Sequence, residues 1–142
     1  MDISSAARGV YMKDIIVDQF QYTVQDLLVR NKSILDSLTK FQDSNASINR
    51  AIVKAVTMCG CISINATKQT FPDTFDYDSI KNSLSTHLNG SLCDNCRDAI
   101  EKEIGKNLFY LASLCNTLDL NLYDIIIKEI ERVKMLDKFS LR

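Results

Sequence analysis

Hydrophobic residues recur every three or four positions over most of the chain, which is the spacing of amphipathic helices. The first run predicts one long helix over about residues 13–43, with an apolar face formed by Ile16, Phe20, Val24, Leu27, Leu28, Leu35, Leu38 and Phe41. The polar segment "DSNAS" at 43–47 supplies turn and N-cap residues. It predicts that a second helix starts near Asn45, with Cys59 on its inward face.

The middle of the chain has a less regular pattern. The second helix is expected to end between Gly60 and Lys68, and "CISIN" alternates as a short strand does. Residues 69–78 contain the single proline and predict a loop. A short helix is predicted at 78–88, ended by Asn89–Gly90.

Two further helices complete the pattern. The third starts at Leu92 and carries its C-x-x-C motif in the first turn. Asn121 is predicted to cap the fourth, whose apolar positions are Leu122, Ile125, Ile126, Ile130 and Val133. Four amphipathic helices with short connections predict an all-α, four-helix antiparallel bundle, with the apolar faces of the first and last helices buried.

Length and composition narrow the class of protein. A chain of 142 residues fits one domain, expected over 12–142, after a flexible leader at 1–11 that has no face to bury. Seventeen Lys and Arg against 18 Asp and Glu give no basic excess for nucleic acid. The sequence has no apolar run near the roughly 20 residues of a membrane span, and "MDISSAARGV" does not have the pattern of a secretory signal. A cytoplasmic protein with no membrane partner is therefore expected.

Four of the five cysteines form two short motifs, C-x-C at Cys59 and Cys61 and C-x-x-C at Cys93 and Cys96. In a reducing compartment such pairs indicate metal or redox chemistry more often than disulfides. Four thiolates complete a closed tetrahedral site for zinc or iron. The sequence therefore predicts a four-cysteine metal site, with zinc as the first choice and iron as the second.

Other interpretations of these residues stay open at this stage. Cys59 and Cys93 could be small core residues, and Cys93 with Cys96 could form a redox dithiol. Cys115 lies in the middle of the third predicted helix and is expected to pack in the core. His87, the single histidine, is either a substitute ligand or a surface residue.

Within residues 101–133, the segment "LFYLASLCNTLDLNLYDII" resembles the last two helices of the MazG-like all-α nucleotide pyrophosphohydrolases. In that family an "ExxD" helix runs into "LFYLL…LGIDLEEAL". The resemblance implies a dimer or tetramer, and Mg²⁺ held by an "ExxE"-type motif together with "ExxD". The whole chain also looks like a group of small clostridial proteins, which adds no function.

The alignment implies a degenerate member of that family. It puts Glu103 at the glutamate of "ExxD" but Lys106 at its aspartate, and no carboxylate lies between Asp43 and Asp73. We therefore expect a non-catalytic homo-oligomer with a regulatory or interaction role, whose thiolate site lies between the two helices that would hold Mg²⁺. The alternative is a Mg²⁺-dependent pyrophosphohydrolase that binds a nucleoside triphosphate through Glu103, Glu101 and Asp98.

Overall fold

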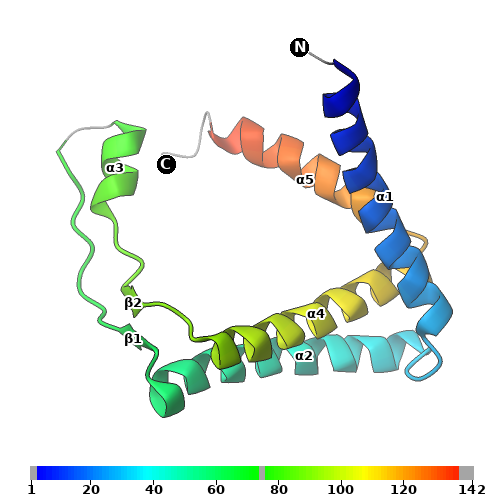
Figure 1. The fold of residues 1–142 in the computed structure, drawn as a ribbon, viewed down its shortest axis with the longest axis horizontal. Helices are drawn as coiled ribbons and strands as arrows, with labels where there is room; N and C mark the ends of the chain where they lie inside the picture. The colour runs from blue at the N-terminus through cyan, green and yellow to red at the C-terminus, as the bar shows by residue number, and fades with distance from the viewer. Residues whose placement is uncertain (1–2, 74–75, 138–142) are drawn as a thin grey trace. The chain divides into compact units, whose positions relative to one another are not determined.

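The computed structural model describes residues 3–73 and 76–137, with side chains from residue 15 to residue 136 in these ranges. The described part is mostly helical and includes one small sheet. Its elements are α1 (Ile3–Leu27), α2 (Ile34–Lys54), the π-turn η1 (Ala55–Cys59), β1 (Ile62–Ile64), α3 (Tyr77–Ser83), β2 (Leu88–Gly90), α4 (Asp94–Thr117) and α5 (Leu122–Asp137) (Figure 1). None of the described helices has the length and apolar character that crossing a membrane requires.

The chain divides into two compact units, each with its own core. The first contains described residues 3–45 and 104–137, and the second contains 46–103, so α2 and α4 contribute to both. The mostly helical class is confirmed, whereas the four-helix antiparallel bundle is not. Assignment of residues 12–142 to one domain stays a prediction, as does the leader at 1–11. The backbone of residues 3–11 belongs to α1, and residues 1–2 lie outside the described part.

The long helix predicted over 13–43 is wrong, because the structure has two helices there. Asn31 adopts a left-handed conformation with φ of 58°, which interrupts a helix and which asparagine tolerates better than most residues. The hydroxyl of Ser37, in the first turn of α2, donates to the carbonyl of Asn31 at 2.9 Å. Apolar spacing continues across this break, so periodicity alone could not reveal it.

The turn predicted at 43–47 is also wrong, because these residues lie inside α2. The Ser44 hydroxyl donates to the carbonyl of Phe41 at 2.7 Å. The Asn107 amide of α4 donates to Ser44 Oγ at 3.0 Å and to Asn45 Oδ1 at 2.6 Å. The polar side chains that suggested a helix cap instead bind the neighbouring helix.

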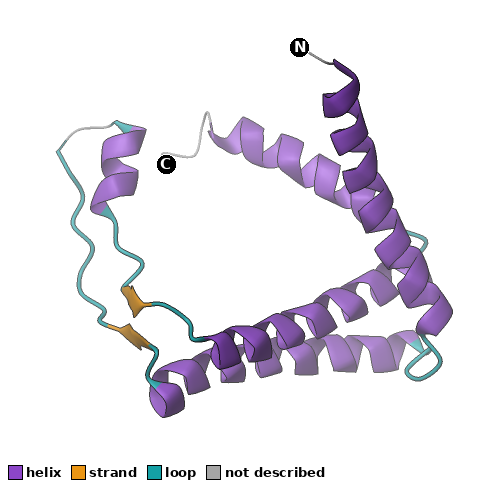
Figure 2. Cartoon of the chain, in the orientation of Figure 1, coloured by secondary structure: helices purple, strands orange, loops and turns teal. Residues whose placement is uncertain are grey.

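The short strand suggested by "CISIN" is confirmed as β1, which pairs antiparallel with β2 (Figure 2). Ile62 lies opposite Gly90 and Ile64 opposite Leu88. The helix predicted over 78–88 is therefore wrong at its end, because α3 stops at Ser83 and Asn89–Gly90 belong to a strand. The described residues between 62 and 92, which include β1, α3 and β2, are called the arm below.

The core of the first unit is formed by Val24, Ala112, Cys115 and Leu122, all buried. Burial of Cys115 confirms its predicted packing role, and the same burial raises the pKa of its thiol. The predicted cap of the last helix is confirmed too, because the backbone N–H of Asp124 donates to Asn121 Oδ1 at 2.9 Å.

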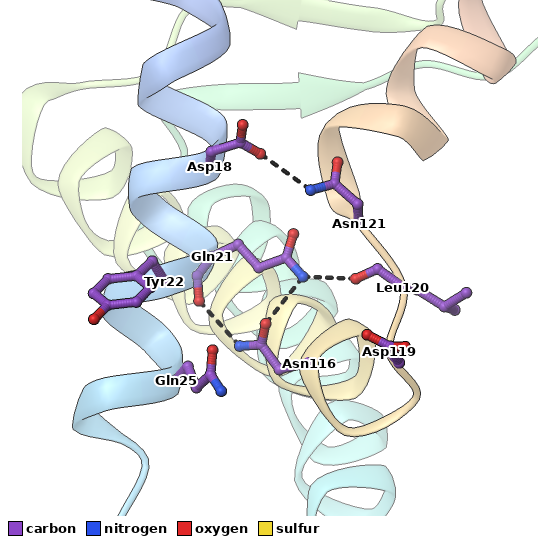
Figure 3. Close-up of a pocket in the computed structure, with 8 residues that line it drawn as sticks. All are labelled: Asp18, Gln21, Tyr22, Gln25, Asn116, Asp119, Leu120 and Asn121. Atoms are coloured by element: carbon purple, nitrogen blue, oxygen red, sulfur yellow. Dashed lines mark hydrogen bonds between the residues drawn. The ribbon is translucent and has the colours of Figure 1, made fainter.

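A buried glutamine connects α1 to the turn between α4 and α5 (Figure 3). The Gln21 amide donates to Asn116 Oδ1 at 2.9 Å and to the carbonyl of Leu120 at 2.7 Å. Its oxygen accepts from the backbone N–H of Leu122 at 2.8 Å. Gln21 and Asn116 line a polar pocket, but their amide groups are hydrogen-bonded within the protein, so we interpret this network as structural.

The predicted burial of the apolar faces of the first and last helices is only partly correct for the single chain, because Val24 and Leu122 are buried but other apolar residues are not. Ile15, Ile16 and Leu27 of α1 are exposed, and so are Ile130 and Val133 of α5. These faces are available for contacts with another molecule.

We predict that Gln21→Ala lowers the free energy of unfolding by about 2–4 kcal/mol, because it leaves the Asn116 oxygen and the Leu122 N–H without their partner. Urea denaturation would measure the loss. Gln25→Ala, one turn further along α1 at an exposed position, is the matched control and should change stability by less than about 0.5 kcal/mol. Equal effects of the two variants would contradict the structural role of Gln21.

Candidate metal centre

The four cysteines of the two sequence motifs converge in the second unit. Cys59, Cys61, Cys93 and Cys96, called the thiol cluster below, have sulfur atoms that all lie within 4.8 Å of one another. Cys59 is exposed and the other three are partly buried. The structure therefore brings together every residue predicted to bind the metal.

The C-x-C motif is shaped by the end of the second helix. The π-turn closes when the Gly60 N–H donates to the carbonyl of Ala55 at 2.9 Å. Gly60 then adopts φ of 77°, a left-handed conformation that favours glycine. The chain reverses there, so Cys61 returns toward the turn and its sulfur lies 3.9 Å from the same carbonyl. The two cysteines can therefore present sulfur to one point despite their close spacing.

Cys61 is held in place by the sheet and by a small core. Ala55, Ile62 and Ile100 are buried together, with Cys61 and Cys96 packed against them. Gly90 of β2 passes close to the backbone of Cys61, and a Cβ atom at Gly90 would lie only 2.6 Å from the Cys61 carbonyl oxygen. The strand pairing that positions Cys61 therefore depends on a glycine at position 90.

The C-x-x-C motif forms the start of α4. The carbonyl of Cys93 accepts the backbone N–H of Arg97 at 2.9 Å, and its sulfur accepts the N–H of Cys96 at 3.4 Å. Cys93 thus acts as the N-cap of the helix, with sulfur in the place of the usual oxygen. The predicted location of this motif in the first turn is confirmed.

The spacing of the sulfurs suits a single ion. Zinc binds cysteine sulfur at about 2.3 Å, so neighbouring sulfurs in a tetrahedral site lie about 3.8 Å apart. Cys59 and Cys93 are separated by 3.8 Å, and the largest separation of 4.8 Å requires only a small contraction. A cluster of several irons would need wider spacing, because its sulfurs bind different iron atoms.

Hydrogen bonding makes the cysteines unequal in acidity. The sulfur of Cys93 accepts hydrogen bonds from the backbone N–H of Cys96 and from the Cys96 thiol. These bonds lower the pKa of the Cys93 thiol to about 7. The pKa of Cys96 is raised to about 12, because its thiol is hydrogen-bonded to Cys93 and partly desolvated. Cys93 therefore ionises before Cys96, and a cation at the cluster would stabilise the thiolates. A divalent ion supplies that charge, since only thiolates bind it well.

The cluster joins the end of the π-turn that follows α2 to the start of α4. His87 is not part of it; the histidine is partly buried, and its Nε2 has no hydrogen-bond partner among the described residues. Among those residues, no other group of three or more His, Cys, Asp or Glu converges on one point. Asp98, Glu101 and Glu103 all lie on α4, and Asp98 is paired with Lys102 at 2.9 Å.

No family model, curated protein or solved structure matches this chain. Its chemistry is therefore inferred from the geometry above.

The sequence pattern missed the role of Gly90. Asn89–Gly90 was interpreted as a helix end, but both residues lie within β2, where Asn89 is opposite Ser63 and Gly90 is opposite Ile62. The alternation in "CISIN" was the available signal, because a short strand next to Cys61 requires a partner strand.

We predict that Gly90→Ala displaces Cys61 and reduces the metal bound per chain. Gly60→Ala is the matched control, because its φ is also positive but a Cβ there has no atom within 4 Å. Each change should cost about 1–2 kcal/mol for the left-handed backbone, but Gly60→Ala should keep its metal. Elemental analysis of both purified proteins would compare them, and full metal content in Gly90→Ala would contradict this role.

Proposed function

We propose that this protein is a non-catalytic, MazG-like helical protein of the cytoplasm in which a four-cysteine zinc site fixes the base of an interaction arm. The observation that carries the proposal is the convergence of four sulfurs within 4.8 Å. Zinc is the first choice and a single iron ion the second, because both take four thiolates in a closed tetrahedral site. Four protein ligands leave no position for a substrate, so the metal has a structural role.

The location of the cluster supports a role in positioning the arm. Cys61 directly precedes β1, and Cys93 directly follows the returning chain, so the metal joins the two ends of residues 62–92. Elsewhere in the arm, Gln69 Nε2 donates to the backbone carbonyl of Ser85 at 2.7 Å, and Gln69 Oε1 accepts the backbone N–H of Ser85 at 3.0 Å. The arm carries exposed Phe71, Tyr77 and Leu88. Apolar side chains on a fixed arm suit recognition of a partner.

The hydrolase alternative rests on the sequence resemblance alone. Mg²⁺ prefers oxygen ligands in octahedral geometry. The carboxylates proposed for it, at Asp98, Glu101 and Glu103, come from a single helix. The thiolates of the cluster do not replace these oxygen ligands for Mg²⁺.

We predict close to one zinc or iron per chain in protein purified from cells, with four thiols protected from titration until the metal is removed. Serine at any position of the thiol cluster should abolish most of this binding. Cys115→Ala is the matched control, because Cys115 is buried in the other unit and its loss should lower stability while the metal stays bound.

Removal of the metal should also lower the melting temperature strongly. Structural zinc contributes on the order of 10 kcal/mol of apparent binding free energy, which is comparable with the roughly 5–15 kcal/mol stability of a whole domain. Chelator should have little further effect on the serine variants. Metal-free protein with four freely titrating thiols would overturn the proposal.

We predict no pyrophosphate release from canonical or modified nucleoside triphosphates with Mg²⁺, because one helix supplies all the candidate ligands. A coupled phosphate assay would test it. Turnover that disappears in Glu103→Ala but persists in the thiol-cluster variants would instead establish the hydrolase alternative.

A further inference from the structure

The four sulfurs of the thiol cluster differ in their access to solvent. Cys59 is exposed, whereas the other three cysteines are partly buried. The chain neighbours of Cys59 are open to solvent too, because Met58 is 77% exposed and a Cβ atom at Gly60 would have no atom within 4 Å. In a closed four-cysteine site every ligand is a thiolate. Access to solvent therefore decides which sulfur a dissolved reagent reaches first, and that sulfur is Cys59.

A second cysteine lies within reach of the exposed one. The sulfurs of Cys59 and Cys93 are 3.8 Å apart, although the two residues are separated by 34 positions in the sequence. Cys59 is the last residue of η1, and Cys93 directly precedes α4. An oxidised Cys59 sulfur needs only a small movement to bond with Cys93. An exposed thiolate beside a resolving cysteine is the arrangement of a reversible oxidation site.

We propose that the thiol cluster is also an oxidation site, at which a peroxide exchanges the bound zinc for a disulfide between Cys59 and Cys93. In the first step the Cys59 thiolate attacks one peroxide oxygen. An S–O bond forms, the O–O bond breaks, and the departing oxygen takes a proton from solvent and leaves as water. In the second step the Cys93 thiolate attacks the Cys59 sulfur. The S–S bond forms, the S–O bond breaks, and the hydroxide that leaves takes a proton to give a second water.

The overall reaction is balanced without any further reagent. The two thiolates lose two electrons in total, one hydrogen peroxide gains them, and two protons from solvent complete two waters. Zinc is neither oxidised nor reduced. It loses two of its four ligands and leaves as Zn²⁺, because Cys61 and Cys96 alone do not complete a tetrahedral site. A dithiol reductant together with zinc restores the starting state.

The disulfide would keep only part of the crosslink that the metal provides. It joins the end of η1 to Cys93, which caps α4. It does not hold Cys61, which directly precedes β1. Oxidation therefore removes the metal's hold on the first strand of the arm while η1 stays joined to α4. This inference deepens the proposed function, because it assigns redox regulation to the same site, and its metal-release step rests on that proposal.

Peptide mapping of the zinc-loaded protein tests the site directly. The protein is treated with hydrogen peroxide, its free thiols are alkylated, and trypsin then places the two cysteine motifs on separate peptides, 55–68 and 82–97. We expect these two peptides to be linked, with the alkyl label on Cys61 and Cys96. A chromogenic chelator should detect about one zinc released per disulfide. Cys115 is the internal control, because it is buried in the other unit and should stay reduced.

Two serine variants compare the sulfurs in the absence of metal. Cys59→Ser and Cys61→Ser each keep three cysteines of the cluster, and each should lack zinc. Only Cys61→Ser keeps the exposed thiol and its neighbour at 3.8 Å. Disulfide formation should be at least about fivefold slower in Cys59→Ser, because susceptibility to oxidation follows exposure. Far-UV circular dichroism would check the fold of both variants, and the wild-type peptide map decides the question if either fails to fold.

Zinc-loaded protein that keeps its zinc and its reduced thiols in peroxide would overturn the inference and leave the zinc proposal intact. Disulfides formed only within each motif would also overturn it, and so would equal rates in the two serine variants. Purified protein without metal would instead contradict the zinc proposal. The peptide map of that metal-free protein would still decide whether Cys59 and Cys93 form the disulfide.

Discussion

Electrostatic repulsion among four closely spaced sulfurs is the constraint on which the second unit depends. The sulfurs lie within 4.8 Å of one another, and their hydrogen bonds lower the pKa of Cys93 to about 7 while they raise the pKa of Cys96 to about 12. Four thiolates at this spacing repel one another strongly unless a cation is present. A bound metal would remove that repulsion and would crosslink the end of the π-turn to the start of α4.

A metal crosslink at this point would act on both sides of the cluster. Cys61 leads directly into β1, which approaches Gly90 so closely that position 90 cannot carry a side chain without movement. Cys93 caps α4, so a metal bound at the cluster would also hold the helix start. Between these points the chain leaves and returns as the arm, whose two sides are joined again at Gln69 and Ser85. A small, closed metal site could in this way orient the whole arm, which has few buried residues of its own.

Local signals in the sequence were reliable where a residue acts on its immediate neighbours. The cap at Asn121 and the C-x-x-C motif at the start of α4 were both predicted correctly, because N-cap chemistry is complete within one turn. Prediction failed where distant contacts decide the structure. Ser44 and Asn45 resemble a helix cap, but Asn107, far along the chain, binds them inside α2. Asn89–Gly90 became a strand because "CISIN" pairs with it, and the convergence of the two cysteine motifs follows from that pairing.

The most direct test of the central claim is X-ray absorption at the zinc edge on protein purified with its native metal. The account predicts a single shell of four sulfurs at about 2.3 Å, with no nitrogen or oxygen ligand. Replacement of any cysteine in the thiol cluster should remove the signal or reduce its sulfur number. A shell that contains nitrogen or oxygen, or purified protein without metal and with freely reactive thiols, would contradict the account.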